Sequence, residues 1–172
     1  MRRLALGAAL CAVLSSAEAA PPPDLAAIAA APVHDLAMTE AGGDARWLLW
    51  STGTGADQAV HLALYRRAKA AWSTAWPDAY GPRLRLMPEW RHGGQPVLAV
   101  TLQFGAAAEQ LDLFGLDAKG QPVRLAEKLG AAVGWAAGTD GTPLVILYDA
   151  AAGALKPSCY SWKDELTAAV CP

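Results

Sequence analysis

The sequence predicts a mostly β fold of antiparallel strands, and three observations support that prediction. From Trp47 onward, short apolar or alternating runs are bounded by glycine, proline and aspartate, a pattern typical of strands and turns. The runs recur roughly every ten residues, too closely for the long crossovers that parallel strands need. The chain also contains 16 Gly and 12 Pro, which suits many tight turns. We expect antiparallel β-meander or propeller-like repeats in a single domain, preceded by a short N-terminal helix or linker.

Residues 1–19 have the pattern of a secretory signal peptide. Arg2 and Arg3 supply the positive charge, an apolar stretch too short to span a bilayer follows, and an A-E-A sequence ending at Ala19 fits a signal peptidase. With the alanine-rich composition, this pattern predicts export to the bacterial periplasm or the extracellular space. We expect no transmembrane segment in the mature chain.

The stretch at residues 20–45 is rich in alanine and proline and has little periodicity. We expect a flexible segment here, in which Asp24 caps one short helix. The β domain is then expected at residues 46–172.

Period-two alternation gives the strands their predicted faces. In residues 60–65 and 110–116, leucine and valine alternate with other residues, so that one face of each strand is apolar. The polar members of these runs, His61 and Asp112, are expected on the solvent face.

Two stretches of the chain, about fifty residues apart, resemble each other. Gly55 matches Gly105, and Trp90 matches Trp135, each tryptophan being followed by a glycine turn and a proline that opens an apolar strand. A period of this size is typical of stacked sheets or propeller-like blades. The expected units are residues 47–97 and 98–149, with a partial unit at 159–172.

Residues 97–166 carry a run that reads G-x-x-x-x-Q-L-D-L-F-G-L-D, then W-x-x-G-T-D-G-T-P-L-V-I-L-Y, then C-Y-S-W-K-D. This run resembles the FG-GAP or VCBS-type repeats of secreted proteins. The resemblance implies β-propeller blades and an interaction role. Some members bind calcium through a D-x-D-x-D-G loop, of which only Asp140 and Gly141 are present here, so the resemblance implies no intact calcium site.

Cys159 and Cys171 are the two cysteines of the mature chain, and in an exported protein such a pair predicts a disulfide. They are symmetric about Glu165, so a hairpin turning at residues 164–166 would bring them together. The bridge would close the last hairpin.

The sequence contains no motif for catalysis, metal binding or cofactor binding, and we expect no cofactor. The histidines lack metal-ligand spacing, the serines lack a G-x-S-x-G context, and TGTG at residues 52–55 fits a hairpin turn better than a phosphate loop. Asp117 and Asp164 are expected in turns. A formal net charge of −2 argues against a nucleic-acid partner. The histidines are His34, His61 and His92, and the serines considered are Ser51, Ser73, Ser158 and Ser161.

Seven tryptophans are the most informative side chains for function. We expect Trp50, Trp90 and Trp135 in the core, where large aromatic rings stabilise sheets. The stretch WSTAWPDAYGPR fits a long aromatic loop, and whether its tryptophans are core or surface is left open. The candidate binding residues are Trp72, Trp76, Tyr80, Arg83 and Arg85.

These observations favour an exported, non-catalytic interaction module of the cell envelope, whose partner is an envelope protein or a glycan. One alternative is a periplasmic inhibitor of a hydrolase that presents a rigid loop at Lys156–Tyr160 beside the disulfide. A second alternative is a hydrolase whose site is dispersed along the sequence.

Overall fold

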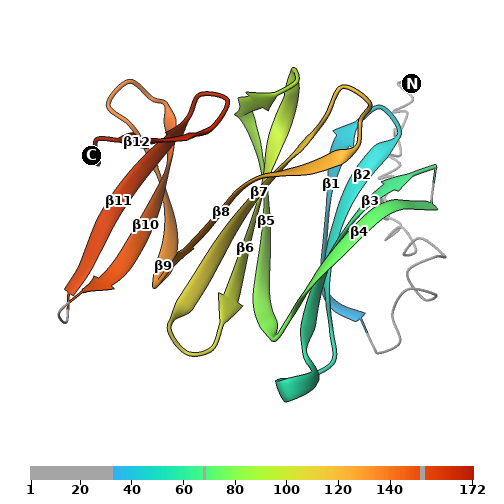
Figure 1. Cartoon of the computed structure of the whole chain (residues 1–172). Helices are drawn as coiled ribbons and strands as arrows, with labels where there is room; N and C mark the ends of the chain where they lie inside the picture. Colours follow the sequence, from blue (N-terminus) through green and yellow to red (C-terminus); the bar gives the residue numbers. More distant parts are fainter. Residues whose placement is uncertain (1–32, 68, 152–153) are drawn as a thin grey trace, which may run out of the picture.

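The computed structural model describes residues 33–67, 69–151 and 154–172 of the chain. Within these ranges the strands pair antiparallel into three four-stranded sheets, which lie side by side in chain order (Figure 1). The predicted mostly β, antiparallel meander is therefore confirmed. The predicted signal peptide and the predicted helix after Asp24 lie outside the described residues.

Each sheet is a meander, because strands that are adjacent in the sequence are also adjacent in space. The first sheet contains β1 (Val33–Gly42), β2 (Ala45–Thr52), β3 (Ala59–Arg66) and β4 (Lys69–Pro77), with the 3-10 turn Gly55–Asp57 between β2 and β3. The second sheet contains β5 (Ala79–His92), β6 (Gln95–Phe104), β7 (Ala108–Leu116) and β8 (Pro122–Gly130). The third sheet contains β9 (Ala132–Ala137), β10 (Pro143–Ala151), β11 (Ala154–Trp162) and β12 (Leu166–Ala169).

The described strands start at Val33 rather than at residue 46, because residues expected to be flexible form β1. This strand pairs with β2 from Val33↔Thr52 to Gly42↔Ala45. Its alternation is weak in the sequence, since an edge strand buries little of either face: Leu36 and Met38 are about half exposed.

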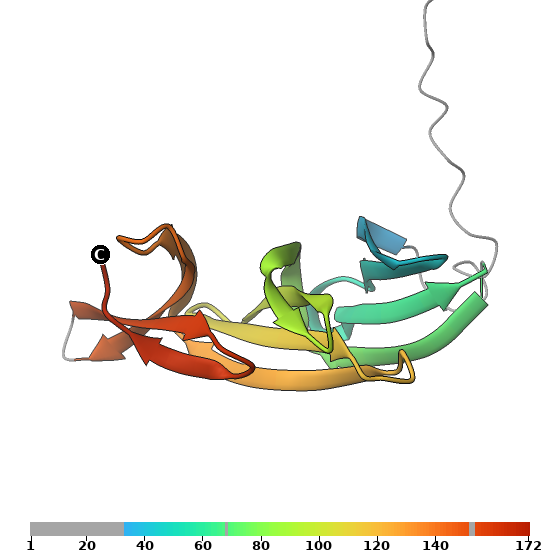
Figure 2. The same ribbon diagram turned by 90° about the horizontal axis from the view of Figure 1, so that it is seen from above.

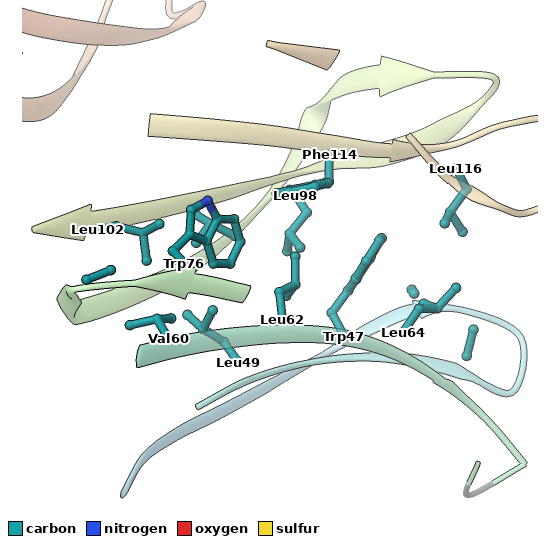
Figure 3. Packing of buried hydrophobic residues seen from close by; sticks show 14 residues of the cluster. Trp47, Leu49, Val60, Leu62, Leu64, Trp76, Leu98, Leu102, Phe114 and Leu116 are labelled. Atoms are coloured by element: carbon teal, nitrogen blue, oxygen red, sulfur yellow. The ribbon is translucent and has the colours of Figure 1, made fainter. Parts of the chain in front are cut away.

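The first and second sheets pack face to face through a large apolar cluster (Figure 3). The alternating residues of the first sheet meet those of the second, as the period-two pattern at residues 60–65 predicts. Phe114 of β7 lies at the centre, with its ring centroid 6.3 Å from that of Trp47 and 6.1 Å from that of Trp76. The labelled members in Figure 3 are Trp47, Leu49, Val60, Leu62, Leu64, Trp76, Leu98, Leu102, Phe114 and Leu116.

A second apolar cluster joins the second and third sheets. Trp90 of β5 is buried there, with its ring stacked on that of Trp162 at 5.9 Å and tilted relative to that of Trp135 at 6.1 Å. The Trp162 indole N–H donates to the Arg91 carbonyl at 2.7 Å. Trp50 and Trp90 are core residues, as predicted, and Trp135 packs against this cluster while partly buried.

The second sheet is covered on both faces, as the three successive layers in Figure 2 illustrate. For this reason the prediction that Asp112 faces solvent is wrong: its side chain is fully buried between the first and second sheets. Alternation identifies the two faces of a strand, but it cannot tell whether a second layer covers the polar one.

The three sheets have different boundaries from the predicted repeat units, because the two full units, residues 47–97 and 98–149, each include strands of two sheets. The matched positions are nonetheless equivalent in the fold. Gly55 and Gly105 lie in the second hairpin of the first and second sheets, and Trp90 and Trp135 lie on the first strand of the second and third sheets. The sequence duplication itself stays a prediction.

The C-terminal hairpin has the predicted disulfide, and its turn, at residues 163–165, lies one residue before the predicted one. Cys159 and Cys171 are bridged, with their Cα atoms 5.2 Å apart, and the register runs from Cys159↔Ala169 to Trp162↔Leu166. Asp164 adopts a positive φ of 65° in the turn. In the part of the chain that the structure describes, no helix has the length and apolarity needed to cross a membrane.

Candidate functional site

The five candidate binding residues lie on two consecutive strands, and the stretch expected to be a loop is not one. Trp72 and Trp76 are on β4, while Tyr80, Arg83 and Arg85 are on β5. Only Asp78, with a positive φ of 61°, separates the two strands. The structure therefore divides the candidates into two groups with different surroundings.

Trp72 and Trp76 belong to the interface between the first and second sheets. The Trp72 ring is perpendicular to that of Trp47 at 6.1 Å and lies 5.8 Å from that of Phe114. Trp76 is only 6% exposed. These two tryptophans hold sheets together, since little of the Trp76 ring can reach a partner.

Tyr80 and Arg83 line a cleft of about 430 Å³ between one end of the second sheet and the start of the third. The Tyr80 hydroxyl donates to the Gly105 carbonyl in the turn between β6 and β7. The Arg83 side chain is 61% exposed. The cleft is lined by Tyr80, Arg83, Gln103, residues 105–109 and residues 131–133.

A kink at Gly81 and Pro82 brings the two side chains into the cleft. The pairing of β5 with β6 shifts register between Tyr80 and Arg83, as at a β-bulge. Gly81 has a φ of +56°, and a Cβ there would come within 2.7 Å of the Gln103 amide oxygen. The left-handed backbone conformation therefore favours glycine at this point, whereas the flexible Gln103 side chain could move to make space.

Glu109, which the sequence analysis did not select, joins three strands beneath the cleft. Its carboxylate is 8% exposed; Oε1 accepts from the Arg83 guanidinium on β5, and Oε2 accepts the Val133 backbone N–H on β9 at 2.5 Å. Arg83 Nε also donates to Thr101 Oγ1 at 3.1 Å. Glu109 thus fixes the position of Arg83 and links the second sheet to the third. Its only sequence signal is a charge within an alternating strand.

Arg85 lies on the same face as Arg83, since the two residues are two positions apart on β5. Its guanidinium carbon sits 4.8 Å from the centroid of the Trp135 ring on β9. Such a cation–π contact orients the guanidinium without neutralising its charge. Tyr80, Arg83 and Arg85 together are called the β5 face below.

A separate polar cluster surrounds Asp112 between the first and second sheets. Gln110 Nε2 donates to Asp112 Oδ2 at 2.9 Å, and Arg124 Nε lies 3.6 Å from Oδ1. Burial raises the pKa of the Asp112 carboxyl, although Arg124 and Gln110 oppose that rise. Because the side chain has no exposed surface, no substrate can reach it in this arrangement.

Replacing Asp112 by asparagine is expected to change how stability depends on pH. The raised pKa means that the folded protein holds this proton more tightly than the unfolded chain, so its contribution to stability is lost as pH rises from about 4 through the folded pKa. The free energy of unfolding of Asp112→Asn minus that of wild type should therefore increase with pH and then level off. Urea unfolding at a series of pH values checks this, and a difference that falls with pH would contradict it.

Within the described ranges, no group of three or more His, Cys, Asp or Glu is placed to hold a metal ion. Asp140 instead serves its own turn, where its Oδ1 accepts the Thr142 backbone N–H at 2.9 Å, a bond that lowers the pKa of the carboxyl. Asp117 caps the turn between β7 and β8 in the same way, as predicted, by accepting the Lys119 and Gln121 N–H groups.

No family model matches this chain, and neither a curated protein nor a solved structure matches it.

Proposed function

We propose that this protein is an exported, non-catalytic interaction module of the cell envelope, and that the β5 face binds a carboxylate-bearing partner. Export is supported by the signal-peptide pattern at residues 1–19 and is compatible with the Cys159–Cys171 disulfide. The residue run at 97–166 that resembles FG-GAP or VCBS-type repeats supports the interaction role as a proposal.

The main support for the proposal is that the Arg83 guanidinium is held in place and yet exposed. Its Nε and Nη2 groups are fixed by Thr101 and Glu109, while 61% of the side chain remains exposed at the cleft. Among the described residues, Nη1 has no hydrogen-bond partner. A guanidinium that is held in place before binding loses little conformational entropy when a ligand arrives.

A carboxylate matches the donors of this face. Guanidinium donors match the two oxygens of a carboxylate, and charge-assisted bonds of this kind are the strongest hydrogen bonds available. Arg85 adds a second cation on the same face, held over Trp135. Tyr80 and Gln103 line the cleft beside them with a phenol ring and an amide.

Arg83→Ala is expected to weaken binding of an oligoglutamate peptide by about ten- to a hundredfold, because a hydrogen bond to a charged group contributes about 1.5–3 kcal/mol. Arg83→Lys should weaken it less than alanine does, since a lysine keeps the charge and loses the bidentate geometry. Isothermal titration at low ionic strength measures both effects.

The matched control is Arg67→Ala. Arg67 is 90% exposed and pairs with Asp44 at 3.0 Å on the first sheet, away from the cleft. Its replacement removes the same charge and should leave the affinity unchanged. If Arg67→Ala and Arg83→Ala lowered the affinity equally, net charge alone would explain the binding. If oligoglutamine bound as tightly as oligoglutamate, recognition of a carboxylate would be excluded.

The inhibitor alternative required a rigid, protruding loop at Lys156–Tyr160. Lys156–Tyr160 lies within β11 and pairs with Val145–Asp149 of β10, so it is a strand and not a protruding loop. The residues around Cys159 lack the apolar alternation that would have predicted a strand here. Turnover of a generic ester, peptide or glycan substrate by the purified protein would favour the hydrolase alternative.

A further inference from the structure

The first sheet has a second apolar face, turned away from the second sheet. Leu48 and Trp50 of β2 alternate with residues of the large cluster, and Ala63 and Tyr65 of β3 lie beside them. These four residues form a cluster of their own. We call it the outer cluster.

The outer cluster is buried although it faces away from the neighbouring sheet. Trp50 and Ala63 are 0% exposed and Leu48 is 1% exposed. Among the described strands of other sheets, β5 and β6 pack most extensively on the first sheet. Both belong to the second sheet, and they contact the opposite face of the first sheet. Burial of a tryptophan on the outside of a single sheet requires a covering segment.

Exposure varies across the sheet in a way that locates this cover. Met38, Leu48, Ala63 and Ser73 are paired across the four strands. The two edge residues, Met38 and Ser73, are exposed, while the two central ones are buried. The cover therefore lies along the middle of the sheet, over β2 and β3. His61 stacks on Trp50 there, with ring centroids 5.2 Å apart, and is hydrogen-bonded to Thr52.

We propose that residues 20–32 of this chain dock on the outer cluster. The described chain starts at Val33, which pairs with Thr52, two residues from Trp50, so the preceding segment is tethered beside the cluster. Extended, these residues reach about 40 Å, several times the roughly 10 Å between three adjacent strands. The segment is apolar, and its two large side chains are Leu25 and Ile28. This inference does not rest on the proposed function.

The test compares the chain from residue 20 with its Leu25→Asp/Ile28→Asp variant by oxidative footprinting, read by mass spectrometry at each tryptophan. Charged groups cannot stay on an apolar face, so oxidation of Trp50 should rise several-fold in the variant. Trp90, between the second and third sheets, should stay protected and thereby report that the fold is intact. If Trp90 is also oxidised, the milder Leu25→Ala/Ile28→Ala variant is read in the same way.

The control variant is Leu155→Asp/Val170→Asp, which places the same two charges at exposed apolar positions of the third sheet and the C-terminus. It should leave Trp50 protected. Unchanged protection of Trp50 in a folded Leu25→Asp/Ile28→Asp variant would overturn the proposal. Protection that disappears when the wild type is diluted would also overturn it, because a second copy would then be the cover.

Discussion

Replacing Phe114 by alanine is expected to lower the free energy of unfolding by about 3–5 kcal/mol, the cost of removing a buried phenylalanine and leaving a cavity. Phe114 is 1% exposed and contacts the rings of Trp47, Trp72 and Trp76, so its loss opens the centre of the interface between the first and second sheets. The Arg124 guanidinium, 5.7 Å from the ring centroid, loses a cation–π partner as well. Urea unfolding followed by fluorescence measures the change.

Leu129→Ala provides the control for this substitution. Leu129 lies on β8 of the same sheet and is 62% exposed, so its truncation should alter stability by no more than about 0.5 kcal/mol. A loss below about 1 kcal/mol for Phe114→Ala would contradict the face-to-face packing of the first two sheets.

Removing the disulfide with Cys159→Ala/Cys171→Ala is expected to lower the free energy of unfolding by about 3 kcal/mol. The bridge closes a loop between residues 12 positions apart, which restricts the unfolded chain. It also holds the end of β11 near Trp162, which packs between the second and third sheets. Thermal unfolding of the oxidised and substituted proteins gives the difference.

Reduction offers an independent check on the same bond. Dithiothreitol should destabilise the wild type to about the level of the double variant and should leave the variant unchanged. Equal stability of the oxidised wild type and the variant would mean that the bridge does not constrain the hairpin.

The inward face of β3 in the first sheet follows its sequence pattern, whereas β7 in the second sheet does not, and the reason is physical. Residues 60–65 alternate because the two faces of β3 have different surroundings, and Val60, Leu62 and Leu64 all pack on the second sheet. The second sheet lies between two others, so both faces of β7 are buried and Asp112 is enclosed with Arg124. How many sheets pack against a strand is decided by the tertiary structure, and alternation within that strand does not predict it.

The ends of the β domain show the same limit in another form. β1 was missed because alanine and exposed Leu36 and Met38 give an edge strand no clear period. The C-terminal hairpin was predicted because two cysteines symmetric about Glu165 indicate its turn to within one residue, although the observed register, Cys159↔Ala169, is centred on Asp164. A disulfide can be predicted from the positions of two cysteines, whereas the pairing of an edge strand depends on the neighbouring strand.

Three of the five candidate binding residues share one strand, and the binding site itself stays a prediction. The sequence selected Tyr80, Arg83 and Arg85, which share β5, but it placed Trp72 and Trp76 in one loop with them. Aromatic density alone does not distinguish a packing surface from a binding surface. Glu109 was not selected, because its role depends on strands β5 and β9, which meet β7 only in three dimensions.

Binding of a carboxylate at the β5 face can be followed at the side-chain Nε–H resonances of the arginines in ¹⁵N NMR spectra. The wild-type protein is titrated with oligoglutamate, and each resonance is assigned by single Arg→Lys substitution. We expect the Arg83 and Arg85 resonances to shift with one saturating affinity, while that of Arg67, paired with Asp44, does not shift. Equal shifts at all three arginines, or a shift at Arg67 alone, would contradict it.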